Sequence, residues 1–220
     1  MATSGISNFD PTFDDLLQDA AAMVGGGPIL AEELISAKRG LNYLLTSIQN
    51  KAILLHKVET TNVPVTASTS SITFDSTILD VLKVAVKVSA TEIVMDRDGY
   101  ERWAEIPVKN QPGRPMRYWF DRERNGNRMN LWPVPNTDYT LVITIQKTLE
   151  DTVRAFDNID VPRRFMPALV YGIAYWIGIR RGSRVPDTRL AFIKAQYEAE
   201  LRDAMREDRE RGSIYIRIGR

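Results

Sequence analysis

The stretch FMPALVYGIAYWIGI at residues 165–179 is apolar on nearly every side of a helix, and it decides the fold of this chain. A helix that is hydrophobic all round is a buried helix, so other helices have to surround it. Gly182 and Pro186 end it, and arginines flank it on both sides. It is shorter than a membrane span and contains a proline and two glycines. The stretch therefore predicts the buried part of a helical bundle.

Two further segments predict the helices that cover this core. Asp10-Pro11 ahead of Phe13 predicts a helix start with an Asx cap and a proline near the first turn, and Gly25-Gly26-Gly27 ends that helix. Pro28 opens a longer helix whose apolar stripe needs a partner. The stripes are Leu30, Leu34, Ala37, Leu41, Leu44, Ile48 and Ala52 in this helix, and Leu190, Ile193, Tyr197, Leu201 and Ala204 near the C-terminus.

From about Leu55 the pattern changes to that of strands. β-Branched residues recur between short segments of Ser, Thr and Asp. Val84, Val86 and Val88 alternate with Ala85 and Lys87, which is typical of a half-buried strand. These signals predict strands at 63–65, 72–74, 81–88 and 100–108, and turns at 96–99 and 112–115.

A β-hairpin is the clearest local prediction in this middle region. Asn125-Gly126 is a strong turn signal, and the strand-like stretches 116–121 and 129–132 flank it. The stretch 139–148 then closes the β region, with Leu141, Ile143 and Ile145 at alternate positions.

Together these patterns predict an α+β fold. A helical bundle forms from the N- and C-terminal helices, with an inserted antiparallel β region and an extended C-terminal tail. We expect a single domain over residues 1–220, with helices at 1–55 and 160–211, the β insertion at 56–150 and the tail at 212–220.

The C-terminal tail is unusual because it is strand-like and has no sequence after it to pair with. Its backbone can fold back onto the protein's own sheet, fray, or add to a sheet edge on another chain. Its composition favours donation to a partner, because solvated tails are poor in β-branched and aromatic residues. Gly212 is the expected hinge, and the expected docking residues are Ile214, Tyr215, Ile216, Arg217 and Ile218.

Composition removes several classes of chemistry. The 220 residues carry a net charge of +1, without the basic excess of a dedicated nucleic-acid binder. The absence of cysteine excludes thiol catalysis, thiolate metal sites and disulfides. The single histidine, His56, is more typical of a surface or capping residue than of a catalyst. We therefore expect no catalytic residues, no metal and no cofactor.

Two weaker signals have ordinary explanations. Gly25-Gly26-Gly27 lies between helices and lacks the strand and the Lys-Ser/Thr of a phosphate-binding loop. Adjacent acids at Asp14-Asp15, Glu32-Glu33 and Glu150-Asp151 are more typical of helix first turns and wet faces than of a glycosidase pair. The N-terminus, MATSGISNFD, has no basic or apolar signal-peptide region, which predicts synthesis in the cytoplasm.

Arginine clusters are the more informative charges. Between residues 163 and 184 there are five arginines and no acid, and residues 114–128 contain five more. They are either ordinary surface and interface charges or a basic patch that faces phosphate or an acidic partner. The nearby Trp103, Tyr118, Trp119 and Phe120 are expected in the core rather than as base-stacking residues, and Trp132 is expected to pack within the β region. The possible interface or channel arginines are Arg163, Arg164, Arg180, Arg181 and Arg184.

Several motifs in order resemble the head-to-tail adaptor proteins of tailed bacteriophages, also called connector or tail accessory proteins, which occur chiefly in short-tailed phages. The resemblance covers nearly the whole chain. The motifs are GRPMRYWFD at 113–121, LWPVP at 131–135, YTL at 139–141, LED at 149–151, DVP at 160–162, ALVYG at 168–172, LNYLL at 41–45, and the last helix, where Tyr197 precedes a charged run.

The resemblance implies a non-enzymatic structural protein of the virion neck. Such adaptors form a ring, commonly of twelve copies, beneath the portal of the head. The ring extends the DNA channel, through which DNA passes without specific binding, and it carries the nozzle or other tail proteins. By the same resemblance the segment from Ser213 onward would bind the portal. Assembly would take place in the host cytoplasm, with no membrane involved.

Two other functions stay open at this point. A DNA-binding or packaging accessory protein would use the arginine clusters, and its affinity for DNA would fall steeply with salt. A carboxylate hydrolase would lose all activity when one acid is changed to its amide.

Overall fold

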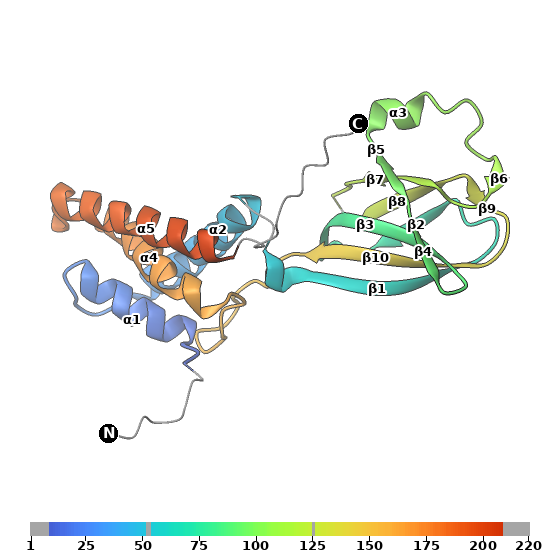
Figure 1. Ribbon diagram of the computed structural model, residues 1–220. Coiled ribbons are helices and arrows are strands. Elements are labelled where there is room, and N and C mark those ends of the chain that lie inside the picture. Colours follow the sequence, from blue (N-terminus) through green and yellow to red (C-terminus); the bar gives the residue numbers. More distant parts are fainter. Residues whose placement is uncertain (1–8, 52–53, 125, 209–220) are drawn as a thin grey trace, which may run out of the picture. The chain divides into compact units, whose positions relative to one another are not determined.

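The computed structural model describes residues 9–51, 54–124 and 126–208 (Figure 1). The chain divides into two compact units: a helical unit from Met1–His56 and Leu149–Arg220, and a β unit from Lys57–Thr148. The helical unit thus combines both ends of the chain, and the β unit is the segment between them. This confirms the predicted α+β fold. The predicted tail at 212–220 lies outside the described residues, and the single domain over 1–220 stays a prediction.

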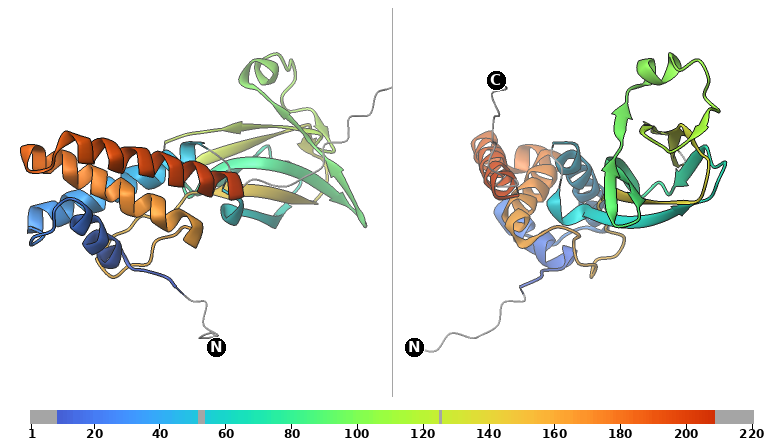
Figure 2. Two further views of the ribbon diagram at one scale, coloured as in Figure 1. Left: turned by 60° about the vertical axis from the view of Figure 1, so that its left-hand side comes forward. Right: turned by 45° about the vertical axis from the view of Figure 1, so that its right-hand side comes forward.

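The helical unit is built around α4. This helix contacts α1, α2 and α5, and its side chains are buried on most sides, as the apolar stretch at 165–179 predicts. Figure 2 shows α5 running alongside α4 in both views. The helices are α1 (Phe13–Met23), α2 (Ala31–Lys51), α4 (Met166–Arg181) and α5 (Asp187–Glu207), with short 3-10 turns at Leu55–Lys57, Arg163–Phe165 and Gly182–Arg184.

The first helix starts at a different cap from the one expected. Thr12, and not Asp10, is the N-cap residue of α1, and its hydroxyl accepts a hydrogen bond from the Asp15 amide. The Asp15 carboxylate accepts in return from the Thr12 amide, which completes a capping box. This reciprocal pair of hydrogen bonds satisfies two backbone amides, whereas a single Asx cap satisfies one. The helix therefore starts after Thr12.

The long helix α2 begins at Ala31 rather than at Pro28. Its expected stripe is confirmed at Ala37, Leu41 and Ile48, which are buried, whereas Leu30 precedes the helix and is 58% exposed. The Leu30 carbonyl accepts the first hydrogen bond of the helix, from the Leu34 amide at 3.0 Å, and the Leu30 amide donates to the Glu33 carboxylate at 3.4 Å.

Close backbone packing joins α2 to α4. A Cβ added to Gly40 would lie 2.7 Å from the Trp176 ring, and one added to Gly172 would lie 2.7 Å from Leu44. Trp176 is fixed in this position because its Nε1 donates to the Ser36 hydroxyl at 3.2 Å. Gly182 then ends α4 with φ +56°, and Ile193, Leu201 and Ala204 bury the stripe of α5 as predicted.

The β unit contains two four-stranded sheets, ordered β1-β10-β3-β4 and β2-β8-β7-β5, and the short pair β6-β9. Most pairings are antiparallel, but β5–β7 and β6–β9 are parallel. The elements are β1 (Val58–Val65), β2 (Ser71–Phe74), β3 (Ile78–Val88), β4 (Thr91–Val94), β5 (Asp96–Asp98), α3 (Tyr100–Ala104), β6 (Pro112–Gly113), β7 (Arg117–Asp121), β8 (Asn127–Trp132), β9 (Val134–Pro135) and β10 (Tyr139–Lys147).

One apolar core joins the two sheets of the β unit. Leu141 and Ile143 of β10 are fully buried, as their alternation predicts, together with Val84 and Val86 of β3. The second sheet contributes residues from β7 and β8 to the same cluster, so the unit is a sandwich. Two expected positions on β3 are reversed: Ala85 is buried and Val88 is 37% exposed.

The predicted hairpin is confirmed. Strands β7 and β8 pair antiparallel from Arg117 opposite Trp132 to Asp121 opposite Arg128. Gly126 has φ +137° in the connection, whereas Asn125 lies outside the described residues.

Three local predictions in the β unit are wrong. The expected turn at 96–99 is the strand β5, because Asp96–Asp98 pairs with β7. The expected strand at 100–108 begins with the helix α3, whose last carbonyls at Trp103 and Ala104 accept from the Lys109 ammonium. The expected turn at 112–115 begins with β6, which pairs with β9.

Candidate functional site

The five arginines of the 163–184 cluster lie at the two ends of α4. Arg163 and Arg164 lie in the 3-10 turn before the helix, and Arg180, Arg181 and Arg184 lie at or just after its end. The helix has 16 residues, so the two groups are roughly 24 Å apart. The structure therefore does not gather them into one basic patch.

Arg181, the last residue of α4, binds both α2 and the glycine segment before it. Its Nε and Nη2 donate to the two carboxylate oxygens of Glu33 at 2.9 and 3.0 Å, and its Nη1 donates to the Gly26 carbonyl at 2.9 Å. The Arg181 hydrogen bonds hold the pKa of Glu33 below its usual value, and Glu33 raises the pKa of Arg181. This side chain is thus committed to a fixed contact between α4, α2 and the glycine break.

The other arginines at this end of α4 are more accessible. The Arg180 guanidinium lies 5.4 Å from the centre of the Trp176 ring, a cation–π distance. Trp176 also contacts Tyr43, at 5.7 Å between ring centres, and Tyr43 is 60% exposed. Arg184 is exposed and adds to the positive field that lowers the pKa of Glu33.

Asp208, the last residue described, is held at the end of α5. Its carboxylate is buried, pairs with Arg164, and accepts a hydrogen bond from the Leu55 amide at 3.4 Å. The end of α5 is therefore fixed beside Leu55, the first residue of the 3-10 turn that follows α2. The expected hinge Gly212 and the expected docking residues Ile214, Tyr215, Ile216, Arg217 and Ile218 lie beyond it, outside the described residues.

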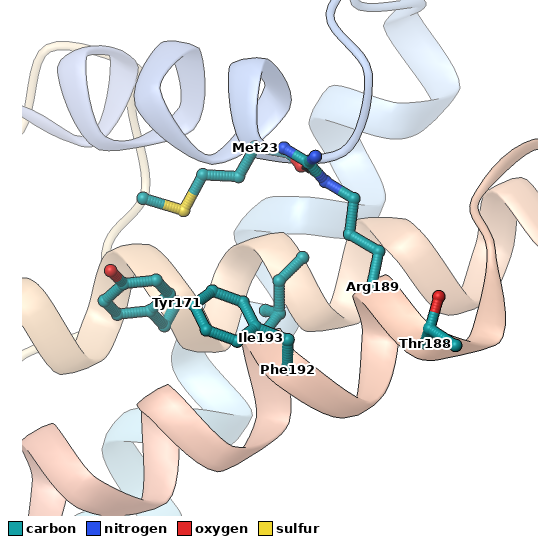
Figure 3. Close-up of a pocket in the computed structure, with 6 residues that line it drawn as sticks. All are labelled: Met23, Tyr171, Thr188, Arg189, Phe192 and Ile193. Atoms are coloured by element: carbon teal, nitrogen blue, oxygen red, sulfur yellow. Dashed lines mark hydrogen bonds between the residues drawn. The ribbon is translucent and has the colours of Figure 1, made fainter.

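A groove crosses the helical unit between α1, α4 and α5 (Figure 3). Met23, Tyr171 and Ile193 line it, and the Phe192 ring beside them is 58% exposed. Arg189 closes one side through a hydrogen bond from its Nε to the Met23 carbonyl at 2.5 Å. The volume is about 400 Å³, and the lining is mainly apolar.

A second exposed apolar feature is the loop between β10 and α4. Val153 is 64% exposed and Phe156 is 68% exposed. The loop is nevertheless firmly held, because the Asp157 carboxylate accepts from the Val153 and Arg154 amides and the Asp157 carbonyl accepts from the Phe13 amide. Two exposed apolar side chains thus lie on a backbone that these hydrogen bonds fix.

Three of the four aromatic residues expected in the core of the β unit are buried: Trp103, Tyr118 and Phe120. Trp119 is only half-buried, on the opposite face of β7 from Tyr118 and Phe120, and it stacks on Trp103 with ring centres 5.9 Å apart. Trp132 packs against the neighbouring strand, as predicted. Its ring lies 5.5 Å from the Arg117 guanidinium, and its Nε1 donates to the Val108 carbonyl at 3.0 Å.

Arg117 also joins a buried ion pair that the sequence did not indicate. Its Nη2 lies 2.9 and 2.8 Å from the two oxygens of Asp98, whose side chain is fully buried, and Arg102 approaches the same carboxylate at 3.4 Å. Arg122 and Arg97 pair with Asp80 on the same unit. These arginines of the β unit are thus matched by carboxylates.

The acid pairs of α1 and α2 and the single histidine lie in three different helical segments. Asp14 and Asp15 lie in the first turn of α1, and Glu32 and Glu33 lie in the first turn of α2, as expected for helix first turns. His56 is exposed in the 3-10 turn before β1. Among the described residues, no group of three or more His, Asp or Glu side chains is placed to hold a metal ion.

No helix within residues 9–51, 54–124 and 126–208 is both long enough and apolar enough to span a bilayer.

The sequence did not indicate the groove, the fixed loop or the buried carboxylate of Asp208. Phe192 lies on the charged side of the α5 pattern as a single apolar residue, and Val153 and Phe156 lie in a segment without periodicity. Asp208 belongs to the charged run EDRER at 207–211, which gives no sign of burial. The two exposed phenylalanines are visible in the sequence as apolar residues among polar ones. Because each is isolated, neither indicates a surface by itself.

Comparison with known proteins gives one positive result. The family model of the SU10 adaptor protein matches residues 11–217, which is nearly the whole chain. No curated protein matches the sequence. The match agrees with the resemblance to phage adaptors carried by the motifs between residues 41 and 172. The chain belongs to the SU10 adaptor protein family.

Proposed function

We propose that this protein is a structural adaptor of a bacteriophage virion, which connects the portal of the head to the tail or nozzle. The observation that carries the proposal is the adaptor-family match over residues 11–217. The first-turn positions of Asp14-Asp15 and Glu32-Glu33 are those of ordinary helix-stabilising acids, which agrees with a structural role. The protein would reside in the virion neck and assemble in the host cytoplasm.

We further propose that copies of the chain form a closed ring, of twelve subunits by analogy with head-to-tail adaptors. A ring with rotational symmetry uses two different faces of each copy, one against each neighbour. The groove at Phe192 and the loop at Phe156 are two separate apolar surfaces of the helical unit that suit such contacts. Burial of these side chains would favour association through the hydrophobic effect.

The segment from Ser213 to Arg220 is proposed as the portal-docking element, with Gly212 as its hinge. Its alternating isoleucines suit addition to a sheet edge or insertion into an apolar crevice of a portal subunit. The fixed position of Asp208 supports this role, because it gives the segment a defined starting point. Twelve weak attachments on one ring would act together through their high effective concentration.

DNA would pass through the ring without specific binding. A lumen with a modest net charge suits that task, because strongly basic walls would retain the DNA. The net charge of +1 is compatible with it. The pairing of Arg181 with Glu33 and of Arg164 with Asp208 weighs against a DNA-binding accessory that uses these arginines.

Deletion of residues 213–220 tests the docking element. We expect the truncated protein to keep its helix content but to lose co-sedimentation with portal rings. Lys194→Met, a change at an exposed ion pair of α5 that leaves both the apolar surfaces and the C-terminal segment unchanged, is the matched control and should co-sediment like the unchanged protein. Co-sedimentation of the truncated chain at the level of the full chain would contradict the docking proposal.

The DNA-binding alternative has its own test. The adaptor proposal predicts no tight binding of duplex DNA by the purified protein at physiological salt. Tight binding without portal, falling steeply as salt rises, would support the alternative instead.

A further inference from the structure

The helical unit has two separate apolar surfaces, and different elements build them. One is the groove at Phe192, which Met23 of α1, Tyr171 of α4 and Ile193 of α5 line. The other is the loop between β10 and α4, residues 149–160, which carries Phe156 and binds the start of α1 and the middle of α2. Both views of Figure 2 show α5 on one side of α4 and this loop on the other. The two surfaces therefore face different directions.

The loop presents its apolar side chains from an ordered backbone. Val153 and Phe156 are largely exposed. The Lys38 ammonium donates to the Val153 carbonyl at 2.9 Å, and the Ala155 carbonyl accepts from the Asp14 amide at 2.9 Å. Because the backbone is already held, burial of these side chains against a partner costs little conformational entropy.

The groove has the size and the lining to take such a side chain. Its volume of about 400 Å³ is within the range of roughly 300–1,000 Å³ that ligand pockets have. Figure 3 shows the Met23 thioether and the rings of Tyr171 and Phe192 around the same space. A phenylalanine ring that enters the groove gains aromatic and sulfur contacts, which are favourable neighbours for it.

The two surfaces also differ in charge. The α5 wall of the groove, residues 188–197, contains two cations and no acid: Arg189 and Lys194. Arg189 is exposed, and its Nε donates to the uncharged Met23 carbonyl. The loop has the opposite balance, with four acids and one arginine: Glu150, Asp151, Asp157, Asp160 and Arg154. Opposite charges on two apolar surfaces favour their approach and disfavour contact of either surface with itself.

We propose that the Phe156 loop of one copy enters the Phe192 groove of the next copy, with the acids of the loop toward Arg189. The single arginine of the loop then faces Asp19 of α1, which lies one turn before Met23. A second copy is the occupant because the groove and a loop of matching character belong to the same chain.

The contact is head-to-tail, because two different surfaces meet and they face different directions. Each copy in a row therefore offers a groove to one neighbour and a loop to the other until a ring closes. This inference rests on the proposed adaptor function, in which copies form a ring, and it names the contact between neighbours.

Mixing two variants tests the contact in the full-length protein. Phe156→Ser leaves the groove unchanged, and Phe192→Ser leaves the loop unchanged. Both side chains are largely exposed, so neither substitution should disturb the fold. In sedimentation velocity over a series of concentrations, we expect the unchanged protein to form species larger than a dimer and each variant alone to associate at least tenfold more weakly. An equal mixture of the two should form a dimer and stop there, because it contains one intact combination of loop and groove.

Tyr43→Ser is the matched control. Tyr43 is an aromatic residue of similar exposure, at 60%, and it lies on the side of α2 that contacts Trp176. This variant should associate like the unchanged protein, because Tyr43 belongs to neither surface.

Four results would overturn the contact: an unchanged protein that stays monomeric at every concentration, a Phe156 or Phe192 variant that associates like the unchanged protein, a mixture that stays monomeric, or a control as weak as the two variants. The proposed function fails by a different result. If Phe156→Ser adds a ring to the portal as readily as the unchanged protein does, this inference alone is overturned. If the mixture gives dimers but the unchanged protein adds no ring to the portal, only the proposed function is overturned.

Discussion

The helical unit and the β unit reach their packed states by different routes. The helical unit joins α1 and α2 from the start of the chain to α4 and α5 from its end, across more than 90 intervening residues. The β unit is one continuous segment, although within it β1 and β3 pair with the distant β10, β2 pairs with β8, and among the described strands only β3–β4 and β7–β8 join consecutive ones. The helical unit therefore has to bring both ends of the chain together, whereas every described strand pairing of the β unit lies within one segment.

The two units also differ in how tightly the backbones approach. In the helical unit, glycines let α2 and α4 meet at the Trp176 ring, and a bidentate ion pair closes one end. In the β unit, strand register and one shared apolar core provide the packing. We infer that the helical unit is the more sensitive to small changes in side-chain volume.

The largest test of this comparison removes one core side chain from each unit. Leu169 of α4 and Ile143 of β10 are both fully buried. Changing either to alanine should cost about 2–5 kcal/mol, because it removes apolar burial and leaves a cavity. Hydrogen exchange should show Leu169→Ala weakening the helical unit alone and Ile143→Ala weakening the β unit alone. Equal loss in both units would show one cooperative domain instead.

The ion pair at the end of α4 gives the next largest effect. Arg181→Met should destabilise the helical unit by about 1.5–3 kcal/mol, because it removes charge-assisted hydrogen bonds to Glu33 and leaves that carboxylate partly buried. Denaturant unfolding measures the loss. Lys194→Met, at an exposed pair of α5, is the control and should change the stability by less than about 0.5 kcal/mol.

The same pair predicts a dependence on pH. Because Arg181 holds the pKa of Glu33 in the folded state below its usual value, the stabilisation is complete above the usual glutamate pKa of 4.5. It is lost as the pH falls through the lower pKa of the folded protein. Unfolding free energy measured against pH should thus drop less in Glu33→Gln than in the unchanged protein over that range. Parallel curves would contradict the assignment.

Helix packing at Gly40 sharpens the comparison further. Gly40→Ala places a methyl group against the Trp176 ring, which the Ser36 hydroxyl holds in place, and overpacking of this kind costs about 1–3 kcal/mol. The matched change in the β unit is Gly99→Ala, where no atom lies within 4 Å of the new methyl. The midpoint temperature of thermal unfolding should fall clearly for Gly40→Ala and little for Gly99→Ala. A similar loss in both would remove the proposed difference in sensitivity.

The smallest effect is expected at the end of α3. The Lys109 ammonium donates to the carbonyls of Trp103, Ala104 and Ile106 at 3.2, 3.3 and 3.1 Å. Lys109→Ala should cost about 0.5–1 kcal/mol, a typical value for a cation at a helix C-terminus. Hydrogen exchange of the Trp103 and Glu105 amides measures it, and Lys109→Arg should restore most of the protection.

The sequence predicted those elements whose pattern is local. The apolar run that became α4, the hairpin of β7 and β8, and the alternation of β10 each follow from adjacent residues. Strand β5 was missed because three polar residues become a strand only through pairing with β7, about 20 residues later. Helix α3 was missed because tertiary contacts of Trp103 and the cap at Lys109 override the strand-like composition of 100–108.

The candidate site was predicted less completely than the fold. The sequence shows the arginine cluster directly. It does not show that the arginines lie at the two ends of α4. Nor does it show that Arg181 and Arg164 pair with Glu33 and Asp208, because these contacts span more than 40 residues. The groove at Phe192 depends on three helices meeting, which a single stripe does not reveal. The sequence therefore predicted where the charged residues are in the chain, but neither their ion-pair partners nor the groove.

Electron microscopy of the protein mixed with its portal tests the central proposal most directly. The adaptor proposal predicts an added ring that is coaxial with the portal and continues its channel, with density from the helical unit in contact with each neighbouring copy. Portal particles that remain unchanged at saturating protein, together with tight binding of the free protein to duplex DNA at physiological salt, would contradict it.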